Sequence, residues 1–156
     1  MPRDATRADW PRLLELNEAS VEQLSPMDEE QLARFVEAAF SLRVAEQDGK
    51  DAGFLLSFRR GAAYRGQVFQ HLSQQAEDFV YIDRVVVDAA VRGRGIASSL
   101  YDDLVATARV AGLPRLLCEA YKTNEQSLSF HARQGFHVFG DFISHGQPVA
   151  LLERRL

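Results

Sequence analysis

The segment Arg92–Ala97 has the composition of an anion-binding loop. It reads Arg-Gly-Arg-Gly-Ile-Ala and leads into a stretch with helical periodicity. Its glycines leave backbone N–H groups unobstructed, and the first N–H groups of a helix have no partner within that helix. The aligned peptide dipoles add about half a positive charge at the same end. With the guanidinium charges of Arg92 and Arg94, the segment predicts a site for a phosphate or a pyrophosphate.

A dinucleotide-binding fold is one interpretation of this loop. Gly93, Gly95 and Ser98 come within one residue of the G-x-G-x-x-G/A fingerprint, and Glu119 follows about where an acid that binds ribose would lie. The third position of the fingerprint is Ser, however. The first glycine also follows the preceding strand at a distance, and little sequence remains after Glu119 for further strands. These three features disfavour the dinucleotide fold.

A second motif downstream gives a better interpretation. Arg92-x-x-Gly95-x-Ala97 matches R/Q-x-x-G-x-G/A, the pyrophosphate loop of the GNAT superfamily of acetyl-CoA-dependent N-acetyltransferases. Residues 124–136 read NEQSLSFHARQGF and resemble that superfamily's second motif, N-x-x-[AS]-x-x-[FL]-[YH]-x-x-x-G-F. The resemblance is specific over about residues 79–140 and general in the N-terminal half. Two motifs in this order, with a strand, a helix and a strand between them, favour membership of the GNAT superfamily over the dinucleotide-binding fold.

The resemblance implies how acetyl-CoA would be held as cosubstrate. Backbone groups at the end of the strand before the loop would pair with the pantetheine arm, and the loop amides would bind the pyrophosphate. Asn124 and Ser127 would face the pantetheine arm, although asparagine is also a favoured helix N-cap. The predicted cofactor-binding residues are Val85, Val86, Val87, Arg92, Gly93, Arg94, Gly95, Ile96, Ala97, Ser98, Asn124 and Ser127.

His131 stands where the superfamily usually has a tyrosine that protonates the departing thiolate. The spacing from Asn124 puts both residues on one helix face, so we expect His131 on the cofactor side and Phe130 on the core side. An ordinary histidine pKa near ~6.5 would let it donate a proton to sulfur. A purely structural histidine is the alternative.

The acceptor amine must be neutral before it can attack, and two acids are candidate bases. Asp83 lies on the strand before the loop, and alternation predicts that Tyr81, Asp83 and Val85 point to one face. Glu119 lies on the next, parallel strand. Either acid could instead pair with an arginine, for example Arg84 or Arg115.

A strand–loop–helix–strand unit must position these side chains. Residues 79–87 are rich in β-branched and aromatic types, which is typical of a buried strand. Apolar residues then recur at helical spacing from 96 to 111, Gly112 and Pro114 end that helix, and 116–120 form a short apolar strand. Such a unit makes a right-handed crossover between parallel strands.

Other elements flank this unit on both sides. A short strand at 2–6 precedes a helix that runs from the Thr6-x-x-Asp9 capping box to about residue 20. A second helix begins at Ser25–Asp28. Strands follow at 40–44 and 53–58, an irregular stretch at 59–78, a helix at 124–134, and strands at 136–139 and 148–153. By resemblance the α/β fold is a GNAT-like mixed sheet of about six to seven strands, with helices on both faces and splayed central parallel strands.

Length, charge and composition restrict the classes of function that the chain can have. The chain has 156 residues, which suits one domain (1–156), and its net charge of −4 argues against nucleic-acid binding. A single cysteine, Cys118, suits a cytoplasmic location and is expected to be buried. No apolar run is long enough to span a membrane, and the four histidines lack a ligand spacing, so we predict neither membrane insertion nor a metal site.

The prediction is an N-acetyltransferase that transfers acetyl from acetyl-CoA to a primary amine of a small-molecule or amino-acid-like acceptor. The amine would attack directly in a ternary complex. The family's common arrangement suggests a homodimer. The alternative is a non-catalytic acyl-CoA-binding or sensor domain on the same fold. Asn17 on the first helix and Arg65 in the 59–78 stretch are candidates for contact with the acceptor.

Overall fold

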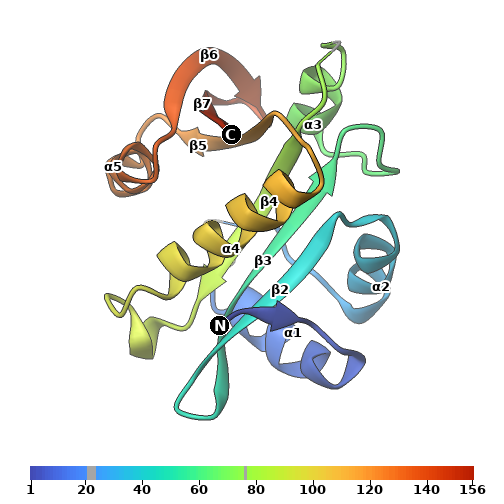
Figure 1. The fold of residues 1–156 in the computed structure, drawn as a ribbon, viewed down its shortest axis with the longest axis vertical. Coiled ribbons are helices and arrows are strands. Elements are labelled where there is room, and N and C mark those ends of the chain that lie inside the picture. The colour runs from blue at the N-terminus through green and yellow to red at the C-terminus, as the bar shows by residue number, and fades with distance from the viewer. Residues whose placement is uncertain (21–23, 76) are drawn as a thin grey trace.

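A seven-stranded mixed sheet organises the molecule (Figure 1). The computed structural model describes residues 1–20, 24–75 and 77–156. The strand order is β1-β2-β3-β4-β5-β7-β6. The strands are β1 (Arg3–Asp4), β2 (Ser41–Gln47), β3 (Lys50–Arg59), β4 (Val80–Val87), β5 (Arg115–Tyr121), β6 (His137–Ser144) and β7 (Gln147–Arg155). The helices are α1 (Trp10–Glu18), α2 (Glu29–Ala38), α3 (Gln67–Leu72), α4 (Ile96–Val110) and α5 (Glu125–Arg133), with 3₁₀ turns η1 (Arg7–Asp9) and η2 (Ala89–Val91).

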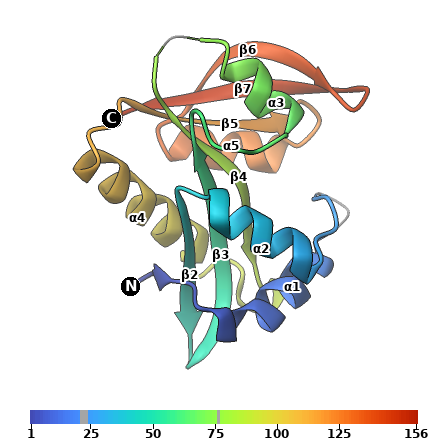
Figure 2. The same cartoon turned by 90° about the vertical axis from the view of Figure 1, so that its right-hand side faces the viewer.

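Helices cover both faces of the sheet, so the interior has two apolar cores (Figure 2). In one, α1, α2 and α3 pack on residues such as Phe54 and Phe58. In the other, Leu100 and Leu104 of α4 pack on Leu55 of the same strand. β3 is therefore buried along nearly its whole length, which explains its run of apolar residues.

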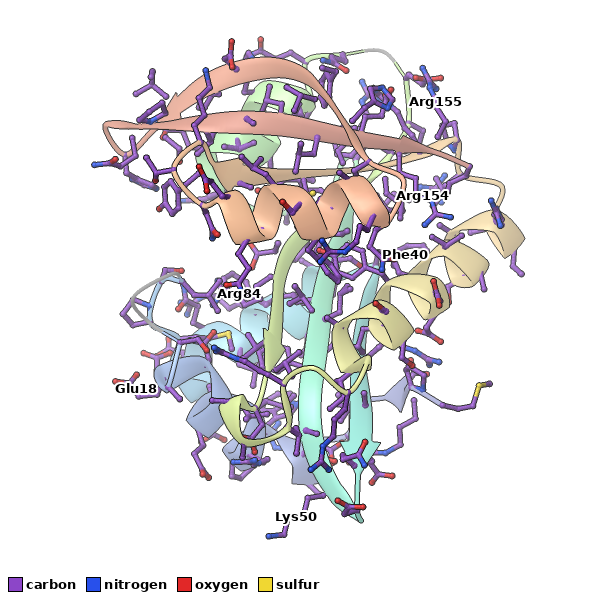
Figure 3. All side chains as sticks on the ribbon, turned by 90° about the vertical axis from the view of Figure 1, so that its left-hand side faces the viewer. Glu18, Phe40, Lys50, Arg84, Arg154 and Arg155 are labelled. Atoms are coloured by element: carbon purple, nitrogen blue, oxygen red, sulfur yellow. The ribbon has the colours of Figure 1, made fainter. Side chains whose placement is uncertain are left out.

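The central parallel strands diverge. Among the described residues, β4 and β5 pair only at Val80–Leu116 and Tyr81–Leu117, near the start of both strands. Beyond that point β4 still pairs with β3, and β5 still pairs with β7. A wedge therefore opens between β4 and the upper part of the molecule that contains β5 and α5 (Figure 3). This confirms the predicted splayed mixed sheet.

A β-bulge in β4 changes which way its side chains point. Leu56 of β3 lies opposite Arg84, whereas the next residue, Ser57, lies opposite Ile82, so Asp83 has no counterpart. Because a bulge interrupts the alternation of a strand, Tyr81 packs in the core under α1–α3 while Val85 packs on the α4 side. The prediction that Tyr81, Asp83 and Val85 share one face is wrong for Val85.

Most predicted elements are confirmed, with shifted boundaries. The capping box is present, since the Thr6 amide donates to Asp9 Oδ2 at 2.7 Å. The second helix begins at Glu29 rather than near Pro26, because the Asp28 side chain caps it by accepting from the Gln31 amide. The stretch 59–78 contains α3, whereas the sequence predicts an irregular segment there. In the part of the chain that the structure describes, no helix has the length and apolar character needed to cross a membrane.

Candidate active site

The loop before α4 is shaped by its glycines. Gly93 and Gly95 have φ angles of 80° and 77°, a left-handed conformation that glycine adopts without steric cost. A Cβ on either residue would meet no atom within 4 Å, so the space above the loop backbone is open. Ile96 packs into the core at the start of α4 and anchors the helix below the loop. Backbone N–H groups at the start of α4 thus border open space.

The two loop arginines lie on different sides of the loop. Arg92 is exposed and borders a shallow hollow with Arg12 and Glu15 of α1. Arg94 lies 3.6 Å from the Asp48 carboxylate at the β2–β3 turn and is half exposed. The Arg94–Asp48 pair is open to solvent, so it neutralises little of the Arg94 charge. Binding of pyrophosphate by Arg92 and Arg94 stays a prediction.

The start of α5 is capped as the sequence predicts. Asn124 Oδ1 accepts from the Ser127 amide at 3.1 Å, which confirms the N-cap role. α5 is tied to α4 by Gln134, whose amide donates to Ser98 Oγ at 3.0 Å. The Ser98 hydroxyl therefore already has a partner within the protein. Contacts from Asn124, Ser127 and Ser98 to the cofactor stay predictions.

His131 points into the protein interior. It is only 6% exposed. Its Nδ1 lies 2.8 Å from the Ser127 carbonyl oxygen, which can only accept, so Nδ1 carries the proton. Nε2 lies 2.7 Å from the Tyr101 hydroxyl and accepts from it in the neutral ring. Burial lowers the pKa of His131, and the hydrogen bond to Ser127 only partly opposes this effect.

The prediction that His131 does not face the core is therefore wrong, and its contact with the cofactor stays a prediction. The helix periodicity was sound, because His131 does lie on the side of Ser127. That side packs against Tyr101 of α4, which offers the imidazole a buried polar partner. Phe130, expected in the core, is only partly buried. A role for His131 as general acid stays a prediction, and these contacts weigh against it.

Glu119 lies at the wedge with a hydrogen bond from Tyr81. The Tyr81 hydroxyl donates to Glu119 Oε1 at 2.8 Å. Burial raises the pKa of Glu119, the hydrogen bond from Tyr81 partly opposes this, and the nearby Asp83 carboxylate raises it further. Glu119 does not take up the alternative ion pair with Arg115, since Arg115 bonds Glu153 at 2.9 Å.

Asp83 is engaged at both carboxylate oxygens. Arg84 Nε donates to Oδ2 at 2.6 Å, so the predicted alternative of an ion pair with Arg84 is confirmed. The Tyr64 hydroxyl donates to Oδ1. Asp83 and Glu119 are thus brought near each other, but only Glu119 keeps a carboxylate oxygen outside these hydrogen bonds.

Arg84 connects this region to α1. Its Nη1 donates to Asn17 Oδ1 at 2.9 Å, and its Nη2 donates to Ser25 Oγ at 3.2 Å. Asn17 is fully buried, and its predicted contact with the acceptor stays a prediction. Figure 3 shows Arg84 at the opening between β4 and α5, on the side of α1. Arg65 is exposed, and none of the described interactions ties it to the carboxylates.

Sequence reasoning missed Tyr64 and Tyr81 as hydrogen-bond donors to the two acids. Tyr81 could have been found, because it lies two positions before Asp83 on the same strand and so on the same face. Tyr64 carried no signal, since it lies in a stretch without clear periodicity.

The splayed strands and the glycine-rich start of α4 lie next to each other and form one candidate ligand-binding region. The sequence matches the model of the Acetyltransferase (GNAT) family over residues 7–136. The chain belongs to this family, and its cosubstrate is acetyl-CoA. The described residues fit that cosubstrate: the loop has open space above its glycines, and β4 runs unpaired on its β5 side beyond Tyr81.

Solved structures with the same fold include several acetyltransferases. The Brucella melitensis ribosomal-protein-alanine N-acetyltransferase has a TM-score of 0.78 and 23% identity, covering 100% of this chain and 99% of that one. The Salmonella typhimurium protein yncA, solved with its cofactor acetyl-CoA, has a TM-score of 0.75 and 19% identity, covering 100% and 93%. Arabidopsis thaliana Naa50, in complex with the bisubstrate analogue CoA-Ac-MVNAL, has a TM-score of 0.75 and 15% identity, covering 100% and 98%. No curated protein sequence matches the chain.

Proposed function

We propose that this acetyltransferase acts on nitrogen, transferring acetyl to the primary amine of a small-molecule or amino-acid-like acceptor while both substrates are bound. One observation carries the proposal. Glu119 is a mostly buried carboxylate at the wedge, and burial raises its pKa toward the range in which a carboxylate acts as a base.

The proposed chemistry begins with the acceptor, which arrives mainly as an ammonium ion. Glu119 takes a proton from it, directly or through one water, and the Tyr81 hydroxyl holds the carboxylate in place. Acetyl-CoA supplies the acetyl group as a thioester. The amine nitrogen forms a bond to the acetyl carbon, and the bond from that carbon to sulfur breaks with its electron pair on sulfur. The nitrogen releases its second proton to the thiolate or to solvent, which leaves a neutral amide.

The departing sulfur does not require an acid from His131. A thiol resembling that of cysteine has a pKa near ~8.5, so its thiolate is a competent leaving group near neutral pH. The neutral tautomer of His131 directs its proton to the Ser127 carbonyl and accepts from Tyr101. His131 is therefore left out of the proposed proton path.

The finer features of the function belong to the same proposal. A small amine acceptor suits the negative charges of Asp83 and Glu119, which lie near one buried arginine. A cytoplasmic location suits the single free Cys118, which is buried as predicted. The homodimer rests on the family's common arrangement alone.

Release of thiol from acetyl-CoA tests the proposal. We expect at least one member of a panel of primary amines, amino acids and short peptides to stimulate thiol release well above hydrolysis, with an acetylated amine found by mass spectrometry. A peptide that outperforms every small amine would correct the acceptor class. Tight binding of CoA with no stimulation by any amine would instead support the sensor alternative.

A further inference from the structure

Two tyrosine–carboxylate pairs lie side by side where the wedge begins. In one, Tyr81 donates to Glu119 at 2.8 Å, and in the other, Tyr64 donates to Asp83. The ring centroids of the two tyrosines are 6.5 Å apart. Only the pair with Glu119 is needed for proton removal, so the second pair requires a separate explanation.

Tyr64 is held firmly by its surroundings. Its ring stacks on Phe58 with centroids 4.1 Å apart and planes 8° from parallel, and it meets the edge of Phe69 at 5.4 Å. A Cβ at Gly66 would lie 2.5 Å from Tyr64 Cε2, so only glycine lets the chain pass this close to the ring. The segment before α3 is thus built to deliver one hydroxyl to Asp83.

Asp83 is fixed equally well from the other side. The side chains of Asp83 and Arg84 are 6% and 4% exposed, and Arg84 Nε donates to Asp83 at 2.6 Å. The remaining guanidinium nitrogens bond Asn17 and Ser25. Because the β4 bulge breaks the alternation after Asp83, Arg84 lies on the same side as Asp83, whose carboxylate has a donor on each oxygen.

We propose that Tyr64 is a positioning residue, which fixes the Asp83 carboxylate as a second, non-reacting negative charge beside Glu119. Asp83 then does not accept the proton of the amine. It sets how strongly Glu119 holds a proton, and Tyr64 sets how much of the Asp83 charge Glu119 experiences. The inference rests on the proposed function, because it concerns the proposed base.

Several charged and titratable groups face Glu119. Tyr81 and Asp83 come from β4, and His145 comes from the β6–β7 turn. Tyr64 and Arg84 act through Asp83. A negative neighbour favours the protonated form of a carboxyl. Removing the Asp83 charge should therefore lower the pKa of Glu119, whereas removing the Tyr64 hydroxyl should raise it, because the Asp83 charge then loses one of its two donors.

The test is whether Tyr64→Phe and Asp83→Asn shift the titration midpoint of Glu119 in opposite directions. The probe is the side-chain ¹³C carboxyl signal of Glu119 in the full chain without substrates, assigned by its loss in Glu119→Gln and followed over pH. We expect the titration midpoint to move to higher pH in Tyr64→Phe and to lower pH in Asp83→Asn. Ser41→Ala serves as control, because it removes a hydroxyl that hydrogen bonds Ser57 on the β2–β3 pair, and its midpoint should match wild type.

A midpoint for Tyr64→Phe that equals wild type, or moves to lower pH, would overturn the inference. Tyr64→Phe keeps the stacked ring, so it decides the question even where Asp83→Asn, which leaves Arg84 without its carboxylate, fails to fold. A purely structural Tyr64 would lower the melting temperature and leave the midpoint in place. Since this readout needs no acceptor, it stands apart from the thiol-release test of the proposed function.

Discussion

At the scale of single residues, the titratable side chains near the wedge differ in how completely they are hydrogen bonded, and this difference decides what each can do. His131 has a partner on both ring nitrogens, whereas Glu119 has one donor and a raised pKa. Groups with complete internal partners hold structure, and a group with a spare oxygen and raised proton affinity can do chemistry. This contrast favours Glu119 over both Asp83 and His131 as the residue that moves a proton.

His131→Phe separates a structural histidine from a catalytic one. We expect kcat within about threefold of wild type, because the neutral ring has no proton free for sulfur. Unfolding free energy should fall by about 1–3 kcal/mol, since the Tyr101 hydroxyl and the Ser127 carbonyl each lose a buried partner. Turnover and thermal melting of the same samples measure both.

The pH dependence of melting adds an internal check. The pKa of His131 is lowered in the folded protein, so on acidification the unfolded chain takes up a proton first, near pH ~6.5. Stability is therefore complete above that pH and declines as the pH falls toward the folded-state pKa. Wild type should lose melting temperature more steeply than His131→Phe below pH ~6.5. A drop in kcat of about 10²–10⁴ in His131→Phe, with an unchanged melting temperature, would show that His131 acts as the general acid.

Local patterns predicted single residues well when their partners were near in sequence. The Asn124 cap, the Thr6–Asp9 box and the burial of Cys118 follow from short spacings and are confirmed. The Tyr64–Asp83 and Tyr101–His131 contacts join residues 19 and 30 positions apart. No local spacing encodes such contacts, so the sequence could place His131 on a helix face without revealing what that face meets.

At the scale of elements, the sequence predicted the order of strands and helices and missed two features. α3 has only six residues, which is too short to show helical periodicity. The β4 bulge has no signature in a run of Val, Ile and Tyr, because any of these residues also suits a regular strand. Both features bear on the site, since the bulge brings Arg84 to the same side as Asp83 and the segment before α3 supplies Tyr64.

The two ends of α4 offer a matched test of the anion loop. Gly95 before the helix and Gly112 after it have φ angles of 77° and 73°, and a Cβ on either would meet no atom within 4 Å. Alanine at either position should cost about 1–2 kcal/mol of stability through the left-handed backbone. Only Gly95→Ala should weaken acetyl-CoA binding, by roughly tenfold or more, equal to about 1.4 kcal/mol.

Calorimetry on both variants measures this difference. The Cβ of Gly95→Ala would enter the space expected for the pyrophosphate, whereas that of Gly112→Ala would lie at the far end of the helix. Equal acetyl-CoA affinity in Gly95→Ala and Gly112→Ala would show that the loop does not bind the cofactor.

At the scale of the whole molecule, the candidate cofactor-binding loop and the candidate base lie on opposite faces of the sheet. The glycine loop and α5 lie with the core under α4, and the two tyrosine–carboxylate pairs lie with the core under α1–α3. The parallel strands part between these faces, just beyond Tyr81. In the proposed function the thioester would reach the carboxylates through the wedge, which would make cofactor binding and proton removal parts of one site.

The pH dependence of acetyl transfer by wild type and Glu119→Gln tests this account most directly. With one amine used for both proteins, the titration of the amine itself contributes equally to each profile. We expect kcat to fall by roughly 10²–10⁴ in Glu119→Gln, acetyl-CoA affinity to stay nearly unchanged, and the acidic limb that reports protonation of Glu119 to disappear. Turnover close to wild type, with the same acidic limb, would contradict the assignment of Glu119 as the base.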